Sequence, residues 1–173
     1  MSDDTAAATS TAPDRDPAPD RDPAPDEGIV AGRVVIVTGA GQGLGAAHAR
    51  AFAQHGAKVV VNDLSEAIHD VVAQIRADGG EATACVADVS DWAQAQALIE
   101  TAVSTYGSLD TLVNNAGITR DRMFVSMSEA EWDAVMKVNL KGHFAPMRHA
   151  VDLWRARIKD GSAATAPPPR VVN

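Results

Sequence analysis

The 173-residue chain is poor in cysteine and tyrosine, with one of each. A single cysteine, Cys85, cannot form an internal disulfide, which favours a reducing compartment, so we expect a cytoplasmic protein. Its neighbours in the sequence EATACVAD are typical of a buried strand, and we expect a core thiol. No apolar run approaches the roughly 18 residues that span a bilayer, and no cationic start precedes an apolar segment. Neither membrane insertion nor export is therefore indicated.

Positive charge is also scarce, because the formal net charge of the chain is -8. Residues 1–27 hold eight acidic and two basic side chains, so the rest of the chain is close to neutral. A body without a basic stripe argues against nucleic acid as a partner. No metal site is predicted from the pattern of potential ligands.

Large apolar residues are missing from the N-terminal segment. Residues 12–27 repeat APDRDP, APDRDP and APDE, with nothing apolar larger than alanine. Such a segment cannot bury enough surface to offset its ordering entropy. We therefore expect residues 1–28 to be a disordered tail and residues 29–173 to form one domain.

The most informative stretch is residues 38–45, TGAGQGLG. Residues 33–37 before it are almost all β-branched and apolar, which is typical of a strand buried on both faces, and residues 46–55 after it are typical of a helix that Gly56 ends. Glycines where a strand turns into a helix let a pyrophosphate approach the backbone and the positive helix N-terminus, although such a turn can also form for steric reasons alone. The sequence predicts a dinucleotide here, bound by Thr38, Gly39, Gly41, Gln42, Gly43, Leu44 and Gly45.

A carboxylate follows the second expected strand, residues 57–62, at Asp63. At the tip of that strand, some 20 residues beyond the glycines, it can accept hydrogen bonds from the adenosine ribose, with Leu64 beside it. The same charge would repel a 2′-phosphate, so NAD is expected in preference to NADP. The alternative is that Asp63 starts a turn and caps the helix that follows Ser65.

Strands and helices then continue to alternate. Helices are expected over residues 66–78 and 91–106, and strands over residues 81–87 and 109–113. The third strand leads into Asp88 and Val89, and the fourth into Asn114-Asn115-Ala116-Gly117. This alternation predicts a doubly wound parallel sheet with its ligand at the carboxyl ends of the strands.

A long helix is expected after the capping box formed by Ser128 and Glu131, with Trp132, Val135 and Met136 on its apolar face. Asn139 lies within it, and Gly142 and Pro146 can disturb it locally. Residues 170–173, RVVN, are typical of the opening of a fifth strand.

The spacing T-G-x-x-x-G-x-G, the N-N-A-G after the fourth strand and Asn139 in the long helix together resemble the short-chain dehydrogenase/reductase family. The resemblance implies a Rossmann-like α/β fold, here truncated at the start of its fifth strand. It implies that Gly39, Gly43 and Gly45 hold the pyrophosphate. It also places Asp88 and Val89 beside the adenine, and Asn115, Ala116 and Gly117 on the nicotinamide side.

The same resemblance gives Asn139 a supporting role in catalytic proton relay. Two simpler interpretations remain open: Asp88 forms an ordinary turn, and Asn139 is a solvent-exposed helical residue. The implied partner is a small carbonyl or alcohol substrate. A full-length relative is expected to be a homo-oligomer.

The family's serine and Tyr-x-x-x-Lys acid/base pair are missing from these residues. Tyr106, the single tyrosine, is followed at the lysine position by Asp110. We therefore expect an inactive fragment that carries only the cofactor-binding half. The alternative is a noncatalytic dinucleotide-binding protein. The stretches VVVNDL and ITRDRMF resemble 3-hydroxyacyl-CoA dehydrogenases and 3-oxoacyl carrier-protein reductases, which suggests a 3-oxoacyl or 3-hydroxyacyl thioester substrate.

Overall fold

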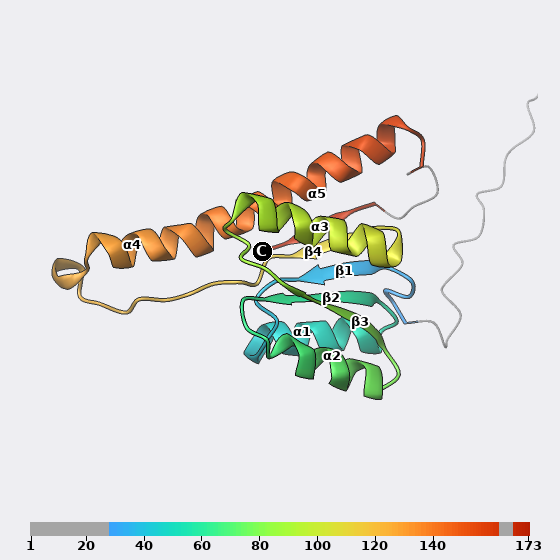
Figure 1. Cartoon of the computed structure of the whole chain (residues 1–173), viewed down its shortest axis with the longest axis horizontal. Helices are drawn as coiled ribbons and strands as arrows, with labels where there is room; N and C mark the ends of the chain where they lie inside the picture. Colours follow the sequence, from blue (N-terminus) through green and yellow to red (C-terminus); the bar gives the residue numbers. More distant parts are fainter. Residues whose placement is uncertain (1–27, 163–167) are drawn as a thin grey trace, which may run out of the picture.

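A computed structural model describes residues 28–162 and 168–173. The expected tail, apart from Gly28, lies outside the described residues. Within them, five parallel strands form one sheet in the order β3-β2-β1-β4-β5 (Figure 1). The elements are β1 (Val34–Val37), α1 (Gly43–Gln54), β2 (Lys58–Asp63), α2 (Ile68–Ala77), β3 (Glu81–Val86), α3 (Trp92–Tyr106), β4 (Thr111–Val113), the 3-10 turn η1 (Phe124–Ser126), α4 (Glu129–Met136), the π-helix η2 (Lys137–Lys141), α5 (Gly142–Lys159) and β5 (Arg170–Val172).

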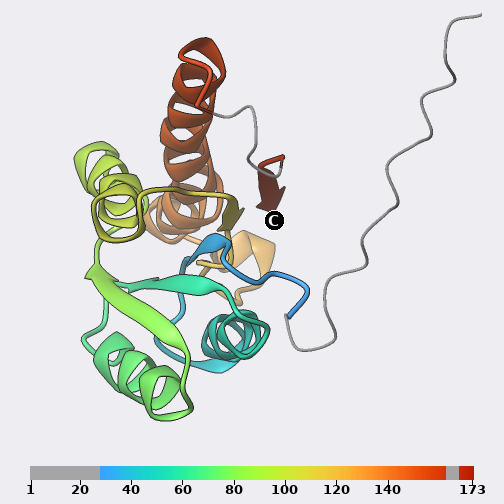
Figure 2. The same cartoon turned by 90° about the vertical axis from the view of Figure 1, so that its right-hand side faces the viewer.

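Helices cover both faces of this sheet, as the alternating sequence predicts. Helices α1 and α2 pack on one face, and α3 and α5 pack on the other (Figures 1 and 2). Strand β1 lies between them: Val35 and Val37 face α1 and α2, whereas Val34 and Ile36 face α3 and α5. Each such buried side chain contributes about 1.5–3 kcal/mol. Burial on both faces explains why this strand is a continuous apolar run.

The expected helix boundaries are confirmed to within a few residues. Asp91 caps α3 by accepting a hydrogen bond from the Gln94 amide at 2.9 Å, and Gly107 ends the helix with a φ of 78°. The predicted apolar face of α2 is buried along its whole length, at Ile68, Val71, Val72 and Ile75.

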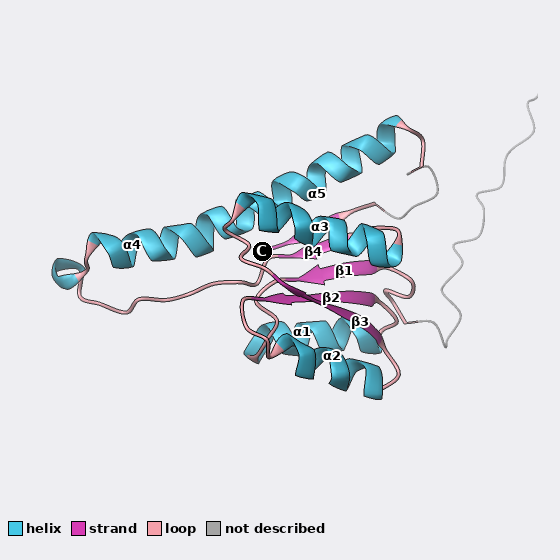
Figure 3. Ribbon diagram, in the orientation of Figure 1, coloured by secondary structure: helices cyan, strands magenta, loops and turns pink. Residues whose placement is uncertain are grey.

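The strand order places the turning point of the fold between β1 and β4. After β1 the chain adds β2 and β3 on one side of this strand in the sheet. It then adds β4 and β5 on the other side of β1. All strands run in one direction, so their carboxyl ends share one edge of the sheet (Figure 3). After β1 the chain continues into α1 on one face of the sheet, and after β4 it leads to α5 on the other face. Doubly wound sheets bind ligands at this point.

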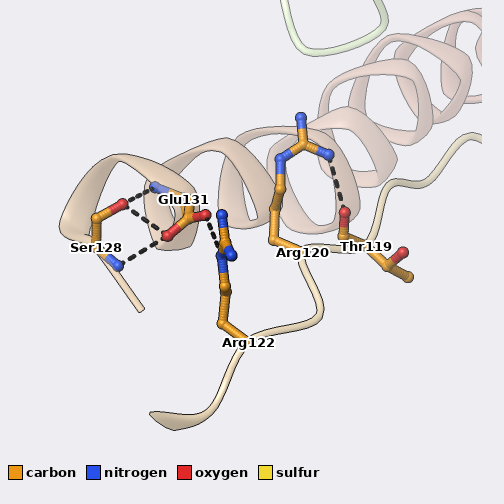
Figure 4. A network of polar contacts seen from close by, with 5 residues as sticks. All are labelled: Thr119, Arg120, Arg122, Ser128 and Glu131. Carbon is orange, nitrogen blue, oxygen red and sulfur yellow. Dashed lines mark hydrogen bonds and ion pairs between the residues drawn. The ribbon is translucent and has the colours of Figure 1, made fainter. Parts of the chain in front are cut away.

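The predicted long helix is divided into α4, the π-helix η2 and α5. The local disturbance expected around Asn139 is thus confirmed, since this residue lies inside η2. The capping box at Ser128 and Glu131 is also confirmed, and Arg122 adds a 2.9 Å hydrogen bond to the Glu131 carboxylate (Figure 4). Among the described helices, none is both long and apolar enough to cross a membrane.

The prediction of a buried Cys85 is confirmed only in part, and Trp132, on the predicted apolar face of the long helix, is exposed. Both residues lie at the margins of the molecule. Cys85 is only partly buried, since β3 is an edge strand that pairs with β2 alone within the described chain. Trp132 is 54% exposed, because α4 extends away from the sheet (Figure 1). Periodicity gave the apolar side of each element correctly but could not show whether another element covers it.

Candidate functional site

A cavity of about 450 Å³ opens at the carboxyl ends of the strands, and most of the predicted ligand-binding residues line it. The glycine turn contributes Gly39, Gln42, Leu44 and Gly45. The ends of β2 and β3 contribute Asp63, Leu64, Asp88 and Val89, and the segment after β4 contributes Asn115, Ala116 and Gly117. Segments from four strand ends thus meet at one site, as their common position after parallel strands predicts.

The glycine turn approaches the segment after β4 too closely for side chains. A Cβ on Gly39 would lie 2.7 Å from the Cα of Ala116, and Gly39 has a φ of +61°. A Cβ on Gly45 would lie 2.5 Å from the Asn115 Nδ2. These glycines therefore have a steric role, which allows the turn and the cavity to form side by side.

The N-terminus of α1 at this turn fits an anion. The helix begins at Gly43, and within the described residues no side chain caps it and no acidic side chain lies in its first turn. A side chain at Gly43 would project into open space, and Leu44 is 75% exposed. The first amide groups of a helix need acceptors and carry partial positive charge, so a diphosphate suits this end of the cavity.

Thr38, Gly41 and Gly43 lie beside the cavity rather than on its lining. Thr38 is fully buried, and its hydroxyl accepts hydrogen bonds from the amides of Asn115 and Ala116, both at 3.0 Å. In return, the Asn115 side-chain amide donates to the carbonyls of Thr38 and Gly39, at 2.9 and 3.0 Å. Thr38 thus holds the glycine turn and the segment after β4 together.

Asp63 forms the predicted turn and lies on the lining of the cavity. One carboxylate oxygen accepts a hydrogen bond from the Gly41 amide at 3.0 Å, and the other accepts from the Ser65 amide at 3.1 Å. Helix α2 begins only at Ile68, with Ala67 at its cap position, so Asp63 forms a turn but is not the helix cap. Its carboxylate lies at the tip of β2, on the lining of the cavity.

Asp88 links the end of β3 to the π-helix. Its carboxylate accepts hydrogen bonds from the Ser90 amide and hydroxyl, at 2.8 and 2.5 Å, and pairs with the Lys137 ammonium at 3.2 Å. Partial burial raises the pKa of Asp88, but the Ser90 hydrogen bonds and Lys137 outweigh it and hold the pKa below its ordinary value. The turn interpretation and the position on the cavity wall therefore both apply.

Asn139 lies outside the cavity and holds one of its walls. Its side-chain oxygen accepts from the Ile118 amide at 2.9 Å, and its side-chain nitrogen donates to the Ile118 carbonyl at 3.0 Å. Asn139 is exposed, as the simpler interpretation expects, but both its side-chain oxygen and its side-chain nitrogen bond to the segment after β4. Its neighbour Val138 lines the cavity.

Three residues near the cavity were missed by sequence reasoning: Asn62, Lys137 and His143. Asn62 donates to the carbonyls of Cys85 and Ala87, while its own side-chain oxygen is buried without a hydrogen-bond partner among the described residues. A polar residue inside the apolar run VVVND could have indicated it. His143 lies 3.0 Å from the Ala116 carbonyl, and its only sequence signal is its place four residues after Asn139.

Tyr106 does not lie at this site. It is the last residue of α3 and packs on the core cluster between the sheet, α3 and α5. The centroid of its ring lies 5.9 Å from the Lys58 ammonium nitrogen. Burial and the negative charge of Glu81 raise its pKa above the ordinary value. Across residues 28–162 and 168–173, no group of three or more potential ligands gathers as a metal site.

Comparison with known proteins places this geometry in a family. Residues 33–164 match the sequence profile described as short chain dehydrogenase. The chain is 47% identical over 142 residues to the hydroxyacyl-CoA dehydrogenase ChsB1 of Mycobacterium tuberculosis, covering 79% of this chain and 44% of that protein. It is 45% identical over 114 residues to the 3-oxoacyl-[acyl-carrier-protein] reductase FabG of Thermotoga maritima, covering 65% and 46%.

A solved structure agrees with these relatives. The crystal structure of a short chain dehydrogenase from Mycobacterium avium superimposes with a TM-score of 0.81 at 55% identity, covering 84% of this chain and 53% of that one. The chain thus spans about half the length of each of these three relatives. Profile, relatives, fold and cleft agree, and the chain belongs to the short-chain dehydrogenase family of oxidoreductases.

Proposed function

We propose that this chain binds NAD and is the cofactor-binding part of an oxidoreductase that acts on a carbonyl or alcohol substrate. The observation that carries the proposal is the uncapped N-terminus of α1, which opens onto a cavity that Asp63 also lines. When bound, a nicotinamide cofactor supplies the donor or acceptor of a hydride. The residues of this chain bind it, orient it and enclose one side of it.

The proposed contacts follow the order of the strand ends. The glycine turn, through Gly39, Gly43 and Gly45, binds the diphosphate with backbone amides. Asp63 and Leu64 bind the adenosine ribose. The remaining cavity walls receive the two rings, with Asp88 and Val89 beside the adenine and Asn115, Ala116 and Gly117 beside the nicotinamide.

Preference for NAD over NADP is part of the proposal, and it rests on the charge of Asp63. A carboxylate at the tip of β2 accepts hydrogen bonds from ribose hydroxyls and repels a phosphate in the same place. The proposed cofactor-binding domain comprises residues 29–173.

The proposed substrate is a 3-oxoacyl or 3-hydroxyacyl thioester in the cytoplasm, and the whole enzyme is a homo-oligomer. The substrate class is supported by two similar proteins, a hydroxyacyl-CoA dehydrogenase and a 3-oxoacyl carrier-protein reductase. The second candidate function is dinucleotide binding without catalysis. The placement of Tyr106 in α3, with a raised pKa, favours it for a polypeptide of these 173 residues alone.

Substitution of Leu44 tests the proposal with little risk to the fold. Because Leu44 is exposed in the first turn of α1, a glutamate there is compatible with the helix dipole but places a negative charge where the diphosphate is expected. We expect Leu44→Glu to weaken NADH binding about tenfold or more in calorimetry, with the free energy of unfolding unchanged or raised. The isosteric control, Leu44→Gln, should bind within about threefold of the original chain. Equal affinities for the two variants, or no binding by the original chain, would reject the proposed site.

A further inference from the structure

The segment of residues 116–118 forms one wall of the cavity and is held from two sides. On one side it contacts the glycine turn, through the Thr38 hydroxyl at the Ala116 amide and the close approach of Ala116 to Gly39. On the other side lie the π-helix and the start of α5, where Asn139 engages both backbone polar groups of Ile118. The position of this wall therefore depends on side chains that never line the cavity themselves.

His143 provides a second connection from the helical side, at a different backbone group. Its Nε2 lies 3.0 Å from the carbonyl oxygen of Ala116, and the ring is half-buried. A carbonyl only accepts hydrogen bonds, so the Nε2 atom carries the proton and donates. The preceding residue, Gly142, packs closely against the cavity wall, since a Cβ there would lie 3.0 Å from the Val89 side chain. The first turn of α5 therefore lies directly beside the cavity wall at the point where His143 contacts it.

We propose that His143 is a positioning residue for the nicotinamide end of the cleft, which it sets by holding the Ala116 carbonyl. The inference rests on the proposed function, because it takes the segment after β4 to lie beside the nicotinamide. Ala116 is only 9% exposed, so its carbonyl has few other partners if the imidazole is removed. An unpaired buried carbonyl is costly, and the segment would shift to find another donor.

The shift of residues 116–118 after loss of the His143 imidazole is expected to be local. Thr38 and Asn115 still connect the glycine turn to the start of the segment through bonds at 2.9 and 3.0 Å, none of which involves His143. Asn139 still holds Ile118. The diphosphate and adenosine ends of the cleft therefore keep their geometry, and only contacts with the nicotinamide are weakened.

Two ligands separate this prediction from a general loss of structure. NADH reaches the nicotinamide end, whereas ADP-ribose contains the adenosine and diphosphate but no nicotinamide. We expect His143→Phe to weaken NADH binding about three- to tenfold, the effect of one hydrogen bond, and to leave ADP-ribose binding within about twofold. His143→Gln places a side-chain amide donor near the same carbonyl and should recover most of the NADH affinity.

His149→Phe is the matched control. The His149 ring also points its Nε2 at a backbone carbonyl, that of Trp92 at 3.2 Å, and it lies on the same helix, but Trp92 does not line the cavity. This variant should bind both ligands like the original full chain. Urea denaturation of all variants checks that each remains folded.

The outcomes distinguish the inference from the function on which it rests. If the original chain binds neither ligand, the proposed function fails. If it binds both but His143→Phe weakens both equally, or neither, the function stands and the positioning role of His143 is wrong. Failure of His143→Gln to recover NADH affinity would also overturn the proposed role of His143. That role attributes the loss of affinity in His143→Phe to the missing hydrogen bond to the Ala116 carbonyl.

Discussion

At the scale of single residues, the carboxylate of Asp63 makes a prediction about cofactor choice. We expect Asp63→Ala to weaken NAD binding by about tenfold or more, because a charge-assisted hydrogen bond contributes roughly 1.5–3 kcal/mol. NADP binding should weaken less, since removal of the charge also removes repulsion of the 2′-phosphate. Calorimetric titration of both cofactors gives the ratio of affinities.

The matched control for this experiment is Asp63→Asn. Because Asp63 also accepts from the Gly41 amide, its loss can loosen the glycine turn without any contact to the ribose. Asparagine keeps an acceptor for that amide but loses the charge. A change in the ratio of NAD affinity to NADP affinity in both variants supports the selective role of Asp63. Equal losses of affinity for both cofactors would mean that Asp63 only supports the turn.

Most cavity-lining residues could be predicted because they belong to short, ordered motifs that follow strands. Gly39, Gly45 and Asn115 were found in this way, and the structure brings all three together. The function of the Thr38 hydroxyl and the contact between His143 and Ala116 could not be predicted. Both join residues that are far apart in sequence, 27 positions in the second case, and such contacts leave no periodic signal.

At the scale of elements, the start of α4 predicts a pH-dependent contribution to stability. The pKa of Glu131 lies at about 2 instead of 4.5, because the Ser128 amide, the Arg122 guanidinium and the Ser128 hydroxyl donate to its carboxylate (Figure 4). Because its pKa is lower in the folded state than in the unfolded state, the ionised Glu131 carboxylate stabilises the folded protein fully above about pH 4.5. This stabilisation is lost as the pH falls toward about 2. We expect Glu131→Gln to lower the free energy of unfolding near neutral pH and to cost progressively less across that acidic range.

Urea denaturation at neutral pH and in mild acid measures this difference directly. Glu129→Gln is the control, because Glu129 lies in the same first turn while Glu131 is the residue that completes the capping box. Glu129→Gln should show a smaller loss at neutral pH. A penalty for Glu131→Gln that stays constant down to about pH 2 would contradict the assignment.

Element types and their order were predictable, whereas the π-helix was predictable only as a disturbance. Caps such as Asp91 and Ser128 gave helix starts from the sequence, because their hydrogen bonds are local. Within the π-helix Lys137–Lys141, Asn139 bonds to Ile118, which lies 21 positions earlier in the chain. A tertiary contact of this kind leaves no signal in the local sequence pattern.

At the scale of the whole molecule, the doubly wound parallel sheet was predicted from the alternation of strands and helices, but the exposure of the outer elements was not. The strands at the centre of the sheet are buried. The outer elements β3, β5 and α4 are partly exposed in the described chain. Local patterns report which side of an element is apolar. Whether that side is covered depends on everything else that packs there, which explains why Cys85 is only partly buried and Trp132 is exposed.

A polypeptide of these 173 residues is expected to bind NADH without oxidising it. Its one tyrosine, Tyr106, packs against the core at the end of α3 with a raised pKa, so it cannot serve the cleft as an acid or base near neutral pH. Loss of a positioned acid/base typically lowers a rate by about 10² to 10⁴. We expect NADH oxidation with a 3-oxoacyl thioester to stay at background while calorimetry reports binding, and Tyr106→Phe to change neither result. Turnover that persists through repurification and in Tyr106→Phe would mean that another group of this chain transfers the proton, and Asn139→Ala would then be the first variant to test.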